Sequence, residues 1–426
     1  MVRTRAILVV LGVVTGVAAA APTQRIGGTV RVLAVWGGAE RESFLAMVKP
    51  FEERTGVRVE YEGTRDLNAV LTTRLQAGNP PDVAGLPGPG QMAEFARRGR
   101  LVALDQVLDL RAMRQQYAPT WLELGSVQGR IYGIFIKTAL KGLIWYNPRT
   151  FRQHTSTVPQ TWDALMALTD RIAQTGTTPW CIGLESGAAS GWPATDWIES
   201  LLLHAAGPQL YDRWVAHEIP WTHEAVKAAW ERFGRIATNP RYVLGGPQGV
   251  VSTNFGEAPF PMFTDPPRCY LHHQATFILD FITKQFPNLR PEADVNFFRF
   301  PAIDRRYARA VIAAGDLFGM FRDTPQARAL MQWLVTAEAQ AIWVRRGGAL
   351  SPNRQVDLSA YPDPLSRNAA RILTGADIVR FDGSDLMPAA VNDAFWKATL
   401  EYVQAPARLD ALLRRLEQTA DRAYRR

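Results

Sequence analysis

The chain has 426 residues, of which 47% are hydrophobic and 21% are charged. These proportions exclude a largely disordered chain and allow two or three domains that each bury a core. The formal net charge is +8, but the basic residues are scattered among acids, which argues against a nucleic-acid groove.

The N-terminus has the three parts of a secretory signal. A basic start with Arg3 and Arg5 precedes an apolar run from Ala6 to Ala20, and an Ala-x-Ala cleavage site lies before Pro22. The run is shorter than the about 20 residues of a membrane-spanning helix, with an uncleaved anchor as the alternative. We therefore expect residues 1–21 to be a cleaved signal peptide and the mature chain to be a soluble periplasmic protein.

Two cysteines, Cys181 and Cys269, occur in this exported chain. An even count in an oxidising compartment favours one disulfide between them. The alternative is two buried thiols.

The first part of the chain alternates strand and helix patterns. Strands are expected over 28–34, 57–61 and 82–86, and helices over 41–55, 67–76 and 91–98. This order is the signature of a parallel sheet with helices on its faces. Ligands bind such sheets beyond the carboxyl ends of the strands, which singles out Trp36, Glu40, Arg65 and Asp66. The alternative is a solvated loop. No phosphate-binding glycine motif is present, so a nucleotide site is not expected.

The later patterns predict further helices and strands. Residues 133–146 are strand-rich around an interrupting Lys-Gly, 311–318 form a strand, and helices are expected over 159–174, 195–206, 223–237, about 270–285, 325–345 and from 391 onward. Asp316 follows Gly315 inside the second of these apolar strands. An acid in that place indicates a site residue, and the glycine allows close approach.

The segment SGWPATDWIE, residues 190–199, places tryptophans and acids side by side. A sugar ring has an apolar C–H face and a rim of hydroxyls. Trp192 can stack on the first, and Asp196 can accept hydrogen bonds from the second. The alternative is that Trp192 is core and Asp196 caps a helix. Trp197 points elsewhere on the helix and is expected in the core.

Several segments together resemble a known family. They are WGGAERESF, FEERTGVRVEY, LQAGNPPDVAGLPG, IYGIFIKTALKGLIWYNPRTF, and AAGDLFGMF with the helix that precedes GGALSPNR. In this order they are similar to the extracellular solute-binding proteins of ABC transporters, in the carbohydrate-binding family with a maltose-binding-protein-like fold. SGWPATDWIE and FTDPPRCYLHHQATF resemble its α-glucoside-binding branch.

The resemblance implies an α/β fold of two lobes, each a mainly parallel sheet flanked by helices, joined by a hinge. The N-terminal lobe would contain residues 28–136 plus 307–346, and the C-terminal lobe 137–306 plus 347–426, with both cysteines. Lys137 then falls at one lobe boundary and Arg354 near another, where each would face the cleft. The alternatives are a snorkelling lysine and an arginine paired with an acid. Asp265, in a stiff Asp-Pro-Pro turn, is a site candidate only through the family likeness.

The function implied is that of a periplasmic receptor, not an enzyme, which binds a sugar between its lobes and delivers it to a membrane permease. An α-glucoside or glucose is the expected ligand. A polyamine or a glycerophosphodiester is the alternative in the same fold, and a secreted glycosidase with paired carboxylates is a more distant one. We expect a monomer without cofactor or nucleic acid. No metal is expected either, because the adjacent His272 and His273 would diverge on a helix and could not bind one ion.

Overall fold

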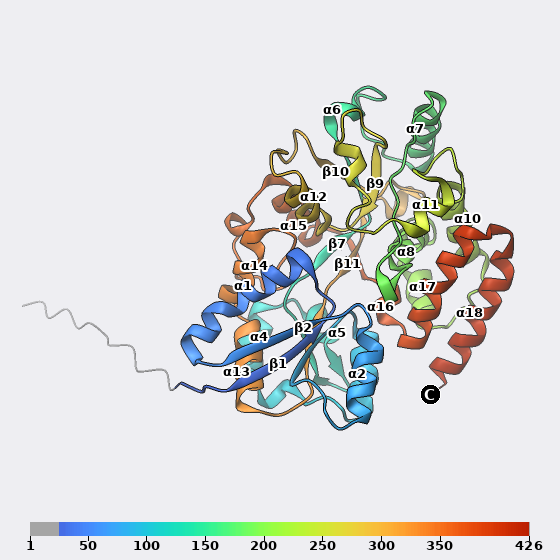
Figure 1. Cartoon of the computed structure of the whole chain (residues 1–426). Coiled ribbons are helices and arrows are strands. Elements are labelled where there is room, and N and C mark those ends of the chain that lie inside the picture. The colour runs from blue at the N-terminus through green and yellow to red at the C-terminus, as the bar shows by residue number, and fades with distance from the viewer. Residues whose placement is uncertain (1–24, 426) are drawn as a thin grey trace, which may run out of the picture.

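The structure is a computed structural model that describes residues 25–425. The predicted signal peptide, residues 1–21, lies outside this range. No helix within the described range is long and apolar enough to cross a membrane. The described chain folds into two lobes (Figure 1). One contains β1 (Thr29–Ala34) and α13 (Pro325–Leu334), and α6 (Pro148–Phe151) and α7 (Trp162–Gln174) lie at the far end of the other.

The first lobe is built on a five-stranded mixed sheet with the order β2-β1-β3-β12-β6. β1 pairs in parallel with β2 and β3, whereas β12 is antiparallel to β3 and to β6. The strands span Thr29–Ala34 (β1), Arg58–Gly63 (β2), Val83–Leu86 (β3), Gly133–Phe135 (β6) and Leu317–Met320 (β12). The predicted βαβαβα order is therefore confirmed, and it forms the parallel half of this sheet.

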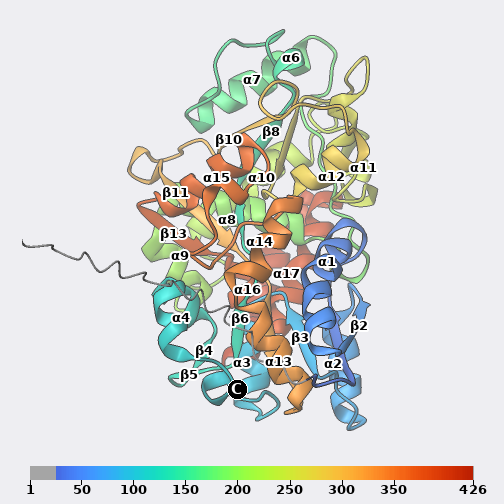
Figure 2. The same ribbon diagram turned by 90° about the vertical axis from the view of Figure 1, so that its left-hand side faces the viewer.

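Helices cover both faces of this sheet, and α1 packs alongside α14 (Figure 2). α1 ends at Thr55, where the sequence predicted its end. The next residue, Gly56, has a φ of 70°, which suits a residue without a side chain. The predicted helix over 325–345 is divided, because Thr336 caps the N-terminus of a second helix. The helices are α1 (Gly38–Thr55), α2 (Leu67–Gln76), α3 (Pro89–Arg97), α4 (Leu110–Gln116), α5 (Pro119–Leu124), α13 (Pro325–Leu334) and α14 (Ala337–Arg346), beside a small hairpin of β4 (Ser126–Val127) and β5 (Arg130–Ile131).

The second lobe contains two three-stranded sheets, β10-β8-β9 and β13-β11-β7. Its strands span Ala139–Lys141 (β7), Leu143–Tyr146 (β8), Leu271–Gln274 (β9), Asn296–Arg299 (β10), Ala310–Ala314 (β11) and Ile378–Phe381 (β13). Only β11 and β13 pair in parallel, while the other three pairs of these two sheets are antiparallel. The expectation of a mainly parallel sheet in this lobe is therefore wrong, because apolar patterns locate strands but do not fix their direction.

The helices of the second lobe surround these sheets. They are α6 (Pro148–Phe151), α7 (Trp162–Gln174), α8 (Trp192–Ala206), α9 (Pro208–Val215), α10 (Glu224–Ala237), α11 (Gly246–Ser252), α12 (Ile278–Gln285), α15 (Pro364–Thr374), α16 (Gly383–Leu386), α17 (Ala389–Gln404) and α18 (Leu409–Tyr424). The expected helix over about 270–285 is wrong in its first part, which is β9. His272 and His273 therefore lie on a buried strand, where adjacent side chains point to opposite faces.

The lobes are joined where three segments cross side by side. Thr138 and Leu350 exchange backbone hydrogen bonds of 2.7 and 2.8 Å. A Cβ atom on Gly315 would lie 2.7 Å from the carbonyl oxygen of Lys137, so only glycine allows this approach. Sheet membership changes between β11 and β12, after the predicted boundary at Tyr307. The structure thus places Lys137 and Asp316 in the crossing segments.

Cys181 and Cys269 form a disulfide with a Cα–Cα distance of 5.6 Å, as the sequence predicted. Both residues lie in the second lobe, in a hydrophobic cluster with Leu143, Trp145 and Met262. The disulfide thus links two parts of one lobe and leaves the other lobe unconstrained.

Candidate functional site

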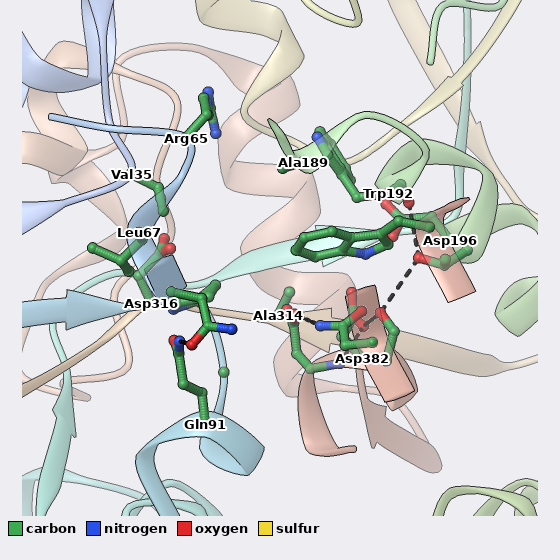
Figure 3. Close-up of a pocket in the computed structure, with 18 of the residues that line it drawn as sticks. Val35, Arg65, Leu67, Gln91, Ala189, Trp192, Asp196, Ala314, Asp316 and Asp382 are labelled. Carbon is green, nitrogen blue, oxygen red and sulfur yellow. Dashed lines mark hydrogen bonds between the residues drawn. The ribbon is translucent and has the colours of Figure 1, made fainter. Parts of the chain in front are cut away.

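A pocket of about 520 Å³ lies between the lobes and beside the crossing segments. Its volume falls within the range of about 300–1,000 Å³ that is usual for small-molecule sites. Both lobes and two of the three crossing segments line its wall, and Trp192 projects into it between Asp316 and Asp196 (Figure 3). Such a site can grip a ligand with both lobes at once.

The wall in the second lobe is organised around Lys141, the last residue of β7. Its Nζ atom lies 2.8 Å from Asp196 Oδ1 and also contacts Asp382 Oδ2. Burial lowers the pKa of Lys141, but the two carboxylates, Asp196 first, raise it by more, so the ammonium stays charged. The same Nζ atom lies 5.2 Å from the Trp192 ring centroid, within cation–π range. Lysine, carboxylates and indole therefore form one unit, here called the Lys141 cluster (Trp192, Lys141, Asp196 and Asp382).

Asp196 leaves one oxygen of this cluster without a partner. The side chain is 3% exposed, and its Oδ2 atom makes no hydrogen bond. Burial raises its pKa from 3.8 to about 7, although Lys141 opposes the shift. A buried acceptor that lacks a donor is unfavourable, and a ligand hydroxyl in the pocket can supply one. Because α8 begins at Trp192 and Gly191 precedes it, Asp196 does not cap the helix.

Glu199, one turn further along α8, holds Asp382 in position from behind the pocket. Its carboxylate accepts hydrogen bonds from the backbone N–H groups of Gly383 (2.8 Å) and Ser384 (3.0 Å). Burial and the neighbouring acids, Asp382 first, raise its pKa well above the usual value. Trp197 is 1% exposed and packs in the core, as expected.

The floor of the pocket carries a second, similar unit, the Lys137 cluster (Trp36, Glu40, Lys137 and Asp316). Lys137 Nζ lies 2.5 Å from Glu40 Oε1 and 3.4 Å from Asp316 Oδ2. Trp36 donates its indole N–H to Asp316 Oδ2 over 3.2 Å. Burial raises the pKa of Asp316, and the pKa of Lys137 is raised by Glu40 and Asp316 against the opposite effect of burial.

Two side-chain contacts connect the lobes. The guanidinium of Arg65, in the first lobe, lies 5.1 Å from the ring centroid of Phe255, in the second. Lys284 and Glu42 form an exposed ion pair of 2.9 Å, also between lobes. The two lobes thus touch each other at two places, one of them between the pocket residues Arg65 and Phe255.

The structure places eight of the ten predicted ligand-binding residues on the pocket wall. These are Trp36, Glu40, Arg65, Asp66, Lys137, Trp192, Asp196 and Asp316. The other two do not line it. Asp265 is an exposed residue of the turn before β9, and Arg354 is exposed with its backbone N–H donated to Gln116. The sequence thus located the turn of Asp265 and the lobe boundary near Arg354, but it did not show in which direction either side chain points.

Several pocket residues were missed by the sequence reasoning. In the sequence, Lys141 was noted only as an interruption of a strand. The residues around it do not indicate that its ammonium group contacts two carboxylates from distant segments. Asp382 follows β13 directly, so the rule that ligands bind beyond strand ends would have found it had that strand been recognised. Gln91, Asn392 and Trp396 gave no signal, since they lie within amphipathic helices.

One group of possible metal ligands lies within the described residues, outside the pocket. His217, Glu417 and Asp421 have ligand atoms within 4.8 Å of one another. His217 and Glu417 already contact each other at 3.2 Å, and Glu417 accepts the backbone N–H of Trp221. None of the three lines the pocket, so the pocket chemistry does not involve this group.

Fold and pocket define a two-lobed protein with a pocket between its lobes. The family model for "Bacterial extracellular solute-binding protein" matches residues 37–341, and the chain belongs to this family. It is 41% identical to the osmoprotective compounds-binding protein GgtB of Synechocystis sp., with 88% of each chain covered. It is 38% identical to the α-glucosides-binding periplasmic protein AglE of Rhizobium meliloti, covering 90% of this chain and 85% of the relative.

Solved structures share the fold. A chitin oligosaccharide binding protein superimposes with a TM-score of 0.81 at 19% identity, covering 94% of this chain and all of that one. The solute receptor AcbH gives a TM-score of 0.81 at 18% identity, covering 93% of this chain and all of that one. The prediction of a two-lobed α/β binding protein rather than an enzyme is confirmed by the family and the fold.

Proposed function

We propose that the protein is the periplasmic receptor of an ABC importer, which binds an α-glucoside or glucose in the pocket and delivers it to the permease. The observation that carries the sugar assignment is the Lys141 cluster: an indole that projects into the pocket beside a buried carboxylate oxygen that lacks a hydrogen-bond donor. A pyranose offers an apolar C–H face to the first and a hydroxyl to the second. The names of the relatives GgtB and AglE support a polar, osmolyte-like or glucosidic solute.

The charges on the pocket wall favour a neutral ligand. Seven carboxyl groups and four cationic side chains line the pocket. A phosphodiester would meet this excess of acids and be repelled. A polyamine would find only Asp66, Asp385 and Asp393 outside the lysine pairs, because Lys137 and Lys141 already hold the other four carboxylates. A neutral polyol is not repelled by the acids and leaves the lysine–carboxylate pairs intact.

Transport follows from a shift between open and closed lobes. A ligand stabilises the closed form only through contacts that the open form lacks. Trp192 lies in the second lobe while Arg65 and Gln91 line the pocket from the first, so a ligand between them bridges the lobes. The closed form is then the one that the permease recognises.

A thermal-shift screen of the mature protein tests this function. The panel contains trehalose, maltose, sucrose and glucose, with spermidine and glycerophosphocholine as the charged alternatives. A ligand at 100 times its Kd stabilises the fold by about 2.7 kcal/mol, so we expect a clear rise in Tm with one or more sugars. Trp192→Ala should reduce this stabilisation to about 1 kcal/mol, because its Kd is expected to be roughly thirtyfold weaker. A response only to spermidine or to glycerophosphocholine would overturn the sugar assignment and leave the receptor fold intact.

A further inference from the structure

Three side chains that can ligate a metal ion meet in the second lobe, outside the pocket. His217 follows α9, while Glu417 and Asp421 lie one turn apart on α18, the last helix, at the right-hand edge of the molecule in Figure 1. Their ligand atoms lie within 4.8 Å of one another. His217 and Glu417 are 200 positions apart, so no local pattern could have indicated the group. The expectation of no metal was based on His272 and His273 instead.

His217 and Glu417 are placed as neighbouring ligands of one ion would be. His217 Nε2 lies 3.2 Å from Glu417 Oε1. In a tetrahedral Zn²⁺ site, bonds of about 2.0–2.1 Å separate neighbouring ligand atoms by about 3.3 Å. A hydrogen bond between the two side chains has a similar length. This distance therefore fits either arrangement, and the third side chain has to distinguish them.

The position of Asp421 favours a cation. Its carboxylate lies within 4.8 Å of the ligand atoms of His217 and Glu417, and two carboxylates this close repel each other unless a cation lies between them. Asp421 is also in the last turn of α18, where the negative end of the helix dipole disfavours an acid and favours a cation. Arg425 lies 3.5 Å from Asp421, but its side chain is 80% exposed, so solvent screens its charge. A hydrogen-bonded pair does not need Asp421, whereas a metal site does.

The surroundings hold two of the ligands in place. Trp221 donates its backbone N–H to Glu417 Oε2 over 2.7 Å, which leaves Oε1 directed at His217. Tyr424, in the last turn of α18, donates its hydroxyl to the carbonyl of Val215, and its ring centroid lies 5.1 Å from that of His217. Outer contacts of this kind orient the ligands in metal sites. A metal ion therefore finds the imidazole and one carboxylate already oriented.

One imidazole and two carboxylates select the kind of metal. Imidazole nitrogen suits Zn²⁺, Cu²⁺ and Ni²⁺, whereas Mg²⁺ and Ca²⁺ prefer oxygen ligands alone. Three protein ligands leave a fourth position for water. The side chains of His217, Glu417 and Asp421 are 11%, 26% and 45% exposed, so an ion can reach them from the solvent, and the Asp421 carboxylate can rotate toward it.

We propose that His217, Glu417 and Asp421 bind a divalent transition-metal ion such as Zn²⁺, which fixes the end of α18 to the turn after α9. The ion stabilises the second lobe, because folding brings the three ligands together and the unfolded chain separates them. This inference does not rest on the proposed sugar-binding function, since none of the three residues lines the pocket.

Isothermal titration calorimetry of the tag-free mature protein with ZnCl₂ tests the site, with MgCl₂ and CaCl₂ for comparison. We expect one Zn²⁺ per chain and no binding of Mg²⁺ or Ca²⁺ at the same concentrations. The variants His217→Asn, Glu417→Gln and Asp421→Asn each remove one ligand. Each should weaken Zn²⁺ binding about tenfold or more, because even an outer partner of a ligand contributes about 10–100-fold to metal affinity. Zn²⁺ should also raise the Tm of the wild type and not that of His217→Asn.

The substitutions are chosen to keep the fold. Asparagine tolerates the left-handed backbone of His217, whose φ is 55°. Glutamine in place of Glu417 keeps an oxygen for the N–H of Trp221. Asp410→Asn is the matched control, because Asp410 is another exposed acid of α18 but pairs with Lys227; it should bind Zn²⁺ like the wild type. Tm values in EDTA establish that each variant is folded.

The site is wrong if the wild type binds no Zn²⁺, or if any of the three variants binds it as tightly as the wild type, because the proposed site needs all three ligands. Equal weakening by Asp410→Asn would also overturn it, since a general effect of charge on α18 would then explain the result. In each of these cases the sugar-binding proposal stands, because the thermal-shift screen tests it separately.

Discussion

The Lys141 and Lys137 clusters use the same residue types to opposite effect. Each places a buried lysine between two carboxylates and about 5 Å from a tryptophan ring. In the Lys137 cluster, Trp36 is 1% exposed and packs against Phe318 and Trp343. Its N–H group is used by Asp316, so the cluster is closed on itself. In the Lys141 cluster, Trp192 is only half-buried, and Asp196 keeps a free oxygen.

This difference separates a structural role from a binding role. A cluster that satisfies its own hydrogen bonds stabilises the crossing of the lobes and offers a ligand little. A cluster that leaves an acceptor and an aromatic face open gains energy only when a ligand arrives. We therefore expect changes at Lys137 and Trp36 to act mainly on stability, and changes at Trp192 and Asp196 to act mainly on binding.

Removal of the lysine charge should have the largest effect, and it should differ between the clusters. Lys141→Met leaves Asp196 and Asp382 buried without a cation, with side-chain exposures of only 3% and 1%. Breaking such a pair costs about 3–5 kcal/mol. Lys137→Met leaves Glu40 and Asp316, which are 12% and 18% exposed and can gain water, so we expect about 1–3 kcal/mol. Denaturant unfolding of the two variants measures the free energies of unfolding. A larger loss for Lys137→Met would contradict the comparison.

The two tryptophans should separate stability from binding. Trp36→Ala opens a cavity among aromatic rings and should cost about 3–5 kcal/mol of unfolding free energy. Trp192→Ala should leave the Tm nearly unchanged and weaken sugar binding by about 2 kcal/mol, roughly thirtyfold in Kd. Unfolding curves and calorimetric titrations on both variants measure the two effects. Equal losses of binding, with Tm preserved in both, would place Trp36 in the ligand site after all.

Much of the fold could be predicted because local patterns determine it. The first strands and helices were located to within a few residues, since Gly56 and the Asn-Pro-Pro turn after α2 interrupt strong periodicities. The prediction of a helix over about 270–285 was wrong at LHHQ, which is a buried strand, because its two histidines break the apolar pattern typical of buried strands. The direction of the strands in the second lobe could not be predicted from the sequence either, because it depends on which distant segments pair.

The site was predictable in part for the same reason. Trp36, Glu40, Arg65 and Asp66 follow strands of one sheet, so their common edge could be inferred from order alone. The meeting of Lys141 with Asp382 joins segments 241 positions apart, and no local pattern encodes such a contact. Gln91 reaches the pocket because α3 packs on α16 through Gly88 and Gly90, and such tertiary packing is not encoded in a local pattern.

The smallest expected effect is the pH dependence of stability that comes from the proton on Asp196. It shows whether the Asp196 side chain, which has one oxygen without a partner, is protonated or ionised in the folded state. The folded state raises its pKa from 3.8 to about 7, so near neutral pH the folded chain holds a proton that the unfolded chain has lost. Stability contributed by this group is therefore lost as the pH rises through about 7. Between about pH 6 and pH 8 the wild type should lose about 1 kcal/mol more than Asp196→Asn, whose amide does not titrate. Unfolding curves at several pH values measure the two slopes. Identical slopes would show that Lys141 and Asp382 already keep Asp196 ionised, and the open acceptor would then be a full carboxylate charge directed at the ligand.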